Sequence, residues 1–102
     1  MPIREDGLHR HTVGCENELR DELKTELQRP KQEGEPEIII EHPSPGTTHI
    51  YVIWSRWEDL DQVVRSRIIL DAFTAVRGED EAIQVTVSMG LTRAEADRLG
   101  IG

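Results

Sequence analysis

The sequence predicts an α+β fold, a small single domain in which a three-stranded mixed sheet is covered by helices on one face. Three observations predict it. The chain has 102 residues, which suits one compact domain. Ile, Leu, Val and Phe form about a quarter of it, above the roughly one-fifth below which charged chains stay disordered. Apolar residues with helical spacing alternate with β-branched runs in the order helix, strand, strand, helix or helix pair, strand, short helix.

The N-terminal segment, residues 1–16, lacks apolar periodicity, and we expect it to be a flexible tail ahead of a single domain over residues 17–102. The domain opens with a helix, because leucine recurs at every fourth position of a segment that is otherwise almost entirely charged or polar. These leucines are Leu19, Leu23 and Leu27. Pro30 ends the helix, since the residue before a proline is pushed out of the helical region.

Two strands are expected next, over residues 37–41 and 49–55. The first is a β-branched run, Glu-Ile-Ile-Ile-Glu. The second carries large apolar residues in both of its alternating sets, so part of it should be covered on both faces. Residues 43–46, Pro-Ser-Pro-Gly, interrupt the chain between them. We therefore expect an antiparallel hairpin with a long loop.

A helical stretch is expected from Ser55 to about Arg77. Ser55 and Glu58 have the spacing of a capping box, and Gly78 is a typical helix stop. The apolar residues of this stretch spread around most of the helix circumference. The spread indicates either a deeply buried helix or two shorter helices that meet near residues 65–67, and we favour the break.

The third strand is predicted by strict alternation of apolar and polar residues. Its apolar positions are Ile83, Val85, Val87 and Met89. A right-handed crossover returns the chain in parallel, which places this strand beside the second or the first. Thr92 and Glu95 form another capping box, so a short helix should follow and end at Gly100.

The charge of the chain disfavours nucleic acid as a partner. Lys and Arg number 12 against 20 Asp and Glu, a formal charge of -8. A phosphate backbone needs a basic face that releases counterions, and the pair Arg65 and Arg67 is too small to supply one. No nucleic-acid partner is therefore expected.

Cysteine content and hydropathy favour a cytoplasmic protein. Cys15 is the only cysteine, so no intrachain disulfide can form, and a secreted domain of this size usually needs several. The N-terminus has no apolar run behind its charges, and about 18 consecutive apolar residues occur nowhere. We expect neither export nor insertion into a membrane.

Two short motifs carry a family resemblance. Residues 57–59, Trp-Glu-Asp, and residues 65–70, Arg-Ser-Arg-Ile-Ile-Leu, have the separation of a Phe-x-Gly and an Arg-His-Arg with its following apolar helix in the BolA-like proteins. His49 is similar to the histidine that opens the second strand of that family. Over about residues 15–100 the chain thus resembles the BolA-like proteins, which share the topology of type II KH folds.

Two departures limit what the resemblance implies. Asp59 replaces the glycine of the first motif, and Ser66 replaces the histidine of the second. In BolA-like proteins that histidine is associated with iron-sulfur clusters shared with monothiol glutaredoxins, and a serine hydroxyl is a much poorer metal ligand. The Gly-x-x-Gly loop with which KH domains clamp nucleic acid is also absent. The resemblance therefore implies the fold more than the cluster chemistry.

Candidate metal ligands occur in two places. His9, His11 and Cys15 form His-x-His-x3-Cys, a set of ligand types that zinc accepts, although a solvated tail is the favoured interpretation. His49 could coordinate a metal or titrate near neutral pH, although an ordinary residue at a strand edge is favoured.

Candidate partner-binding residues lie in the helical stretch and just before it. Tryptophan is favoured at interface anchors, but so small a core makes core positions the favoured ones for both tryptophans, including Trp54. The arginines could bind a carboxylate or phosphate, but ion pairs with Asp61 or Asp71, each four residues from one of them, are favoured. The candidates are Trp57, Arg65, Ser66 and Arg67.

The sequence favours a non-enzymatic protein-interaction or regulatory domain. The one local Cys and His pair, Cys15 with His11, lies in the segment least able to hold catalytic geometry, so no enzyme is expected. The partner is expected to be another protein or a second copy, bound at the open sheet face, an edge strand or the leucine face of the first helix. Two alternatives stay open: metal or iron-sulfur binding through His49 with Cys15 or a glutaredoxin thiol, and RNA binding by KH-like fold analogy.

Overall fold

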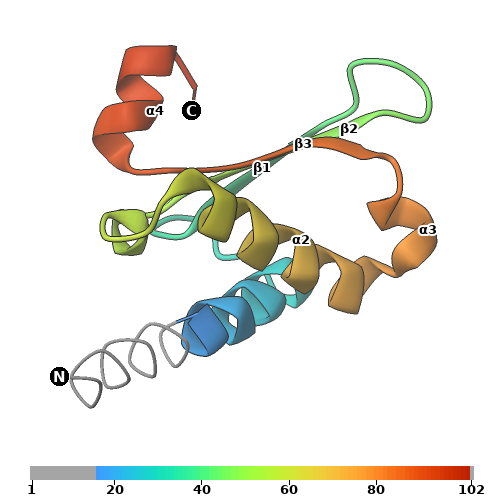
Figure 1. Ribbon diagram of the computed structural model, residues 1–102, viewed down its shortest axis with the longest axis horizontal. Coiled ribbons are helices and arrows are strands. Elements are labelled where there is room, and N and C mark those ends of the chain that lie inside the picture. Colours follow the sequence, from blue (N-terminus) through green and yellow to red (C-terminus); the bar gives the residue numbers. More distant parts are fainter. Residues whose placement is uncertain (1–15, 102) are drawn as a thin grey trace, which may run out of the picture.

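The computed structural model describes residues 16–101 and has the predicted α+β class and element order (Figure 1). Within these residues the N-terminal helix covers residues 16–28. It is followed by β1 (Glu37–Glu41), β2 (Thr48–Ile53), the 3-10 helix η1 (Ser55–Trp57), α2 (Gln62–Arg77), α3 (Glu79–Ala82), β3 (Val85–Leu91) and α4 (Arg93–Leu99). The tail predicted over residues 1–16 lies outside the described residues except for Glu16, which is helical.

The sheet has the strand order β1-β2-β3. β1 pairs with β2 in antiparallel fashion, with Ile39 opposite Tyr51, which confirms the predicted hairpin. β2 pairs with β3 in parallel, with Tyr51 opposite Met89, so the crossover through α2 returns the chain beside the second strand. β1 and β3 are therefore the two edges of the sheet.

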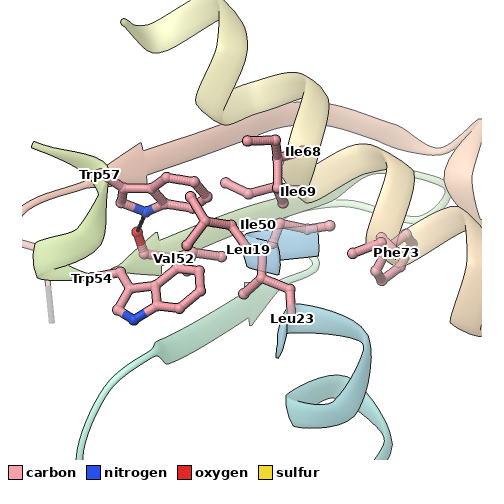
Figure 2. Close-up of a cluster of buried hydrophobic side chains, with 10 residues drawn as sticks. Leu19, Leu23, Ile50, Val52, Trp54, Trp57, Ile68, Ile69 and Phe73 are labelled. Atoms are coloured by element: carbon pink, nitrogen blue, oxygen red, sulfur yellow. Dashed lines mark hydrogen bonds between the residues drawn. The ribbon is translucent and has the colours of Figure 1, made fainter. Parts of the chain in front are cut away.

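The main core lies between the sheet and the two longest helices. One face of the sheet is covered by the N-terminal helix and α2, and the close-up in Figure 2 shows the side chains that fill this layer. The buried members are Leu19, Leu23, Ile50, Val52, Trp54, Trp57, Ile68, Ile69, Ala72 and Phe73. The leucine stripe of the N-terminal helix thus belongs to the core, and this face does not serve as a docking surface.

The short helix α4 packs on the other face of the sheet, at one end (Figure 1). Ala96 of α4 forms a small cluster with Ile53 and Leu91, against which Tyr51 and Met89 are partly buried. The helices therefore cover one face along its length and the opposite face only at the end near α4. This arrangement explains why apolar residues occupy both alternating sets of β2.

The break predicted near residues 65–67 is wrong, because α2 is one continuous helix. It begins later than expected, after Asp61, whose side chain accepts a hydrogen bond from the backbone N–H of Val64. Ser55 caps no helix; its backbone N–H donates to Glu35 instead. The chain turns between η1 and α2, so the interruption lies before the helix and not within it.

The ends of the later elements follow local sequence signals. Gly78 ends α2 with a φ of 91°, and Gly100 ends α4 in the left-handed region. The capping box of Thr92 and Glu95 is present. β3 begins at Val85, so the prediction that Ile83 is a half-buried strand residue is wrong; Ile83 is 81% exposed.

Candidate functional site

A shallow groove runs between α2 and the free edge of β3, and we call it the α2–β3 surface. It is lined by Gln62, Val63, Ser66, Arg67, Leu70, Ser88 and Met89. From Val63 onward the α2 members have the spacing i, i+3, i+4, i+7, which places them on one side of the helix, and Gln62 directly precedes them. Two of the sequence-predicted partner-binding residues, Ser66 and Arg67, lie here.

The side of α2 that lines the groove has an exposed apolar residue at each end. Val63 is 73% exposed and Leu70 is 37% exposed, whereas Ile68, Ile69 and Phe73 of the same helix are buried. The spread of apolar residues that suggested a break thus has another cause. The helix carries one apolar face in the core and a second one at the α2–β3 surface.

The backbone of β3 is capped at a single position on its free edge. The side-chain amide of Gln62 accepts a hydrogen bond from the N–H of Gly90 and donates one to its carbonyl, both at 2.9 Å. Backbone groups alternate in direction along a strand, so those of Ser88 point to the same side as those of Gly90, whereas the pairing of β2 with β3 has a register irregularity at Thr86. Within residues 16–101 no strand pairs with β3 on this side.

The two edges of the sheet differ in their protection against pairing. β1 has a glutamate at each end, Glu37 and Glu41, and prolines occur nearby at positions 36 and 43. Charges and prolines are the usual devices that keep an edge strand from pairing with another chain. β3, Val-Thr-Val-Ser-Met-Gly-Leu, contains neither. Its edge is therefore the one that is chemically suited to pairing.

The electrostatics of the α2–β3 surface differ from those of the whole chain. None of its lining residues is a carboxylate, although 20 of the 102 residues are Asp or Glu. Its one charged side chain, Arg67, forms an ion pair with Glu16 at 3.1 Å. The surface is therefore close to neutral in a strongly acidic protein.

Arg65 is not part of this surface. It is 6% exposed, and its guanidinium donates to the carbonyls of Leu60 at 2.7 Å and Gly90 at 3.1 Å and to the Glu95 carboxylate at 2.7 Å. The backbone N–H of Thr92 and this guanidinium lower the pKa of Glu95 below its ordinary value. Arg65 therefore joins α2 to the end of β3 and to α4.

The ion pairs expected within α2 do not form. Arg65 pairs with Glu95 and Arg67 with Glu16, while Asp71 lies 3.4 Å from Arg20 of the N-terminal helix. Asp61, the other expected partner, caps α2. The prediction failed because each arginine extends toward a neighbouring element instead of along its own helix.

Trp57 is fully buried in the main core. Its ring stacks edge-on against Trp54 with centroids 5.2 Å apart, and its indole N–H donates to the carbonyl of Val52 at 2.9 Å (Figure 2). The favoured interpretation of both tryptophans as core residues is confirmed. With no exposed area, Trp57 supports the fold and does not contact a partner directly.

The candidate metal ligands are not brought together. His9, His11 and Cys15 lie outside the described residues. His49 is half-buried on β2 beside Tyr51, with ring centroids 6.3 Å apart. Its neighbour Ile50 faces the main core, so His49 points to the opposite face of the sheet from α2. In the described part of the chain, no three His, Cys, Asp or Glu side chains are placed to hold a metal ion.

Sequence reasoning missed five members of the α2–β3 surface, namely Gln62, Val63, Leu70, Ser88 and Met89. The available signal was the apolar spread around α2, which was read as a break.

The described residues include no helix with the length and apolarity required to cross a membrane.

Comparisons with known proteins place the chain in no family. It matches no family model, no curated protein and no solved structure. The resemblance to the BolA-like proteins stays a prediction that depends on residues 57–70.

Proposed function

We propose that this chain is a small non-enzymatic protein-interaction domain of regulatory type, and that its partner docks on the α2–β3 surface. The single observation that carries the proposal is an edge strand without charges or prolines that lies beside the exposed apolar residues Val63 and Leu70 of α2. The BolA-like ancestry and a cytoplasmic location, the latter inferred from the single cysteine, are part of the same proposal.

The physical argument concerns unpaired backbone and exposed apolar area. A free strand edge offers N–H and C=O groups to an added strand, and pairing with another chain is the common use of such an edge. Val63 and Leu70 would bury apolar area at the same time. Direct backbone pairing combined with flanking apolar contacts gives both affinity and register.

The experiment that tests the proposal is site-specific photo-crosslinking in cells. A photoreactive phenylalanine analogue replaces Val63 in one variant and Leu99, which is 59% exposed on α4, in a matched control. We expect a discrete protein adduct, identified by mass spectrometry, from position 63 and not from position 99. Both side chains are exposed, so the difference reports the location of the partner and not the access of the probe.

Two results would overturn the proposal. Adducts of equal yield from both positions would indicate non-specific contact. The absence of any protein adduct at position 63, together with saturable binding of a small metabolite elsewhere on the chain, would assign the chain to another functional class.

A further inference from the structure

We infer that this chain has a binding pocket for a small amphipathic organic cation, in which a protonated amine meets the buried carboxylate of Glu26. The pocket has a volume of about 430 Å³, within the range of roughly 300–1,000 Å³ that small-molecule sites occupy. It lies beside β1, at the opposite edge of the sheet from the α2–β3 surface. The inference therefore goes beyond the proposed function and does not depend on it.

Part of the pocket lining is apolar. Ile38 and Ile40 of β1 and Leu27 of the N-terminal helix line the pocket and pack against the main core, yet all three are only partly buried. An apolar body that rests on these side chains would remove their remaining area from water, which is favourable. The lining therefore suits a ligand that has a hydrocarbon part.

Most of the other lining residues belong to the polar connector, residues 30–36. Glu26 ties this connector to the N-terminal helix, because its Oε2 accepts a hydrogen bond from the backbone N–H of Lys31 at 2.7 Å. The Lys31 ammonium in turn donates to the carbonyl of Glu35 at 2.8 Å. Contacts within the chain thus form this side of the pocket.

Glu26 places a carboxylate on the core-facing side of the N-terminal helix. It follows Leu19 by seven residues and Leu23 by three, which is the spacing of the buried face, and it is 6% exposed. A buried charge is costly unless close partners compensate it. The partners of both carboxylate oxygens therefore decide what the residue can do.

The second oxygen of Glu26, Oε1, is the acceptor that the pocket offers. Among residues 16–101 it accepts no hydrogen bond, and its ion-pair contact with the Lys31 ammonium is long, at 3.5 Å. The one fully buried side-chain N or O atom without a hydrogen bond in these residues is Nε of Arg20. Oε1 is therefore not sealed in the core, and a donor in the pocket can reach it.

The charges around the pocket favour a cation over an anion. The guanidinium of Arg77 lies 5.6 Å from the ring centre of Phe73 and pairs with Glu81 at 3.5 Å, so this cation is already engaged. Glu33 also lines the pocket, and no cation of the described residues pairs with it. The net charge of -8 raises the local concentration of cations further.

A ligand ammonium would donate to Oε1 of Glu26 in place of the long contact with Lys31. Such a charge-assisted hydrogen bond is shorter and stronger than a neutral one. The Lys31 side chain is 51% exposed, so it can yield this position while its bond to the Glu35 carbonyl stays. The connector thus remains attached when the ligand is bound.

An NMR chemical-shift titration of the full chain with three probes tests the inference. Phenylbutylamine and phenylbutanoate have the same apolar body and opposite charge, and butylamine has the charge without the ring. We expect saturable binding of phenylbutylamine, with shifts centred on the backbone amides of Lys31, Ile38 and Ile40. The other two probes should bind about tenfold more weakly or worse.

One pair of variants tests the role of Glu26. Glu26→Gln keeps an acceptor for the Lys31 N–H and removes the charge, so the dissociation constant for phenylbutylamine should rise about tenfold or more. The matched control is Glu41→Gln at the exposed end of β1, which makes the same charge change outside the pocket and should alter affinity by less than about twofold. Unfolding curves confirm that each variant is folded.

Several results would overturn the inference. They are equal binding of phenylbutanoate, shifts confined to another surface, unchanged affinity in Glu26→Gln, and no saturable binding of phenylbutylamine at millimolar concentration. The comparison of the three probes uses the wild-type chain, so it decides the matter even if Glu26→Gln does not fold. The crosslink at position 63 reports on the other edge of the sheet, so failure of this inference and failure of the proposed function are separate results.

Discussion

Gly90 occupies a position where packing leaves no room for a side chain. A Cβ atom there would lie 2.8 Å from the Cβ of Arg65 and 2.9 Å from the indole nitrogen of Trp57. Neither side chain can move away freely, because the Arg65 guanidinium donates to the Glu95 carboxylate and the Trp57 indole N–H donates to the Val52 carbonyl. The close approach lets α2 lie directly on β3, which creates the groove beside the strand edge.

Gly90→Ala should therefore lower the free energy of unfolding by about 1–3 kcal/mol, the usual cost of forcing extra volume into a packed core. Urea unfolding monitored by tryptophan fluorescence measures it. The matched control, Thr86→Val, changes an exposed residue on the same strand and should shift the free energy by less than about 0.5 kcal/mol. Equal stability of Gly90→Ala and wild type would contradict the packing described for Arg65 and Trp57.

The Glu95 carboxylate should make the stability of the fold dependent on acid pH. Its pKa is lowered in the folded state by the Thr92 backbone N–H and by Arg65. A lowered pKa means that the contribution is complete above the unfolded value of about 4.3 and is lost as pH falls through the lower folded value.

We expect Glu95→Gln to be less stable than wild type at pH 7, with the difference shrinking as pH falls below about 4. Chemical unfolding at pH 7, 5 and 3 measures the trend, and Glu33→Gln on the exposed connector is the control. A difference that persists unchanged at the lowest pH would show that the carboxylate charge is not the stabilising feature.

At the scale of elements, the N-terminal helix is part of the core. Leu23 is 1% exposed and packs between the sheet and α2. Leu23→Ala should cost about 2–5 kcal/mol through lost transfer energy and the cavity it leaves. Leu99→Ala on α4, where the side chain is largely exposed, should cost far less. Thermal unfolding of both variants tests this. Equal losses of stability in the two variants would mean that the N-terminal helix lies on the surface of the domain and is not part of its core.

Local signals predicted most element boundaries correctly. The β-branched run of β1, the glycines at 78 and 100, and the capping box of α4 act within a few residues, so they can be read from the sequence. The start of α2 could not be read in the same way. Ser55 has capping spacing, but only the 3-10 helix η1 forms at this point, with the Trp57 indole bonded to Val52, and α2 begins after Asp61.

The members of the α2–β3 surface were predictable only in part, because most of them are brought together by contacts between distant parts of the sequence. Ser66 and Arg67 were found because they lie at the position of a family motif. The other members depend on contacts far apart in sequence, such as the bond of Gln62 to Gly90. Nothing in the sequence near Gln62 indicates that its amide will cap a strand edge 28 residues later.

At the scale of the whole molecule, the asymmetry between the sheet edges is the central feature. β1 is bounded by glutamates and prolines, whereas β3 is uncharged and its backbone is bonded to the Gln62 side chain at Gly90. A partner strand added at β3, as in the proposed function, would leave β1 as an exposed edge of the enlarged sheet, and β1 is the strand that carries the glutamates and neighbouring prolines.

The most direct measurement is amide hydrogen exchange at Ser88 with and without the partner that is crosslinked through position 63. The account predicts that the Ser88 amide, which lies on the outer edge of β3, becomes protected when the partner binds, while the Gly90 amide is protected throughout by Gln62. Fast exchange at Ser88 in the presence of that partner would contradict pairing at this edge.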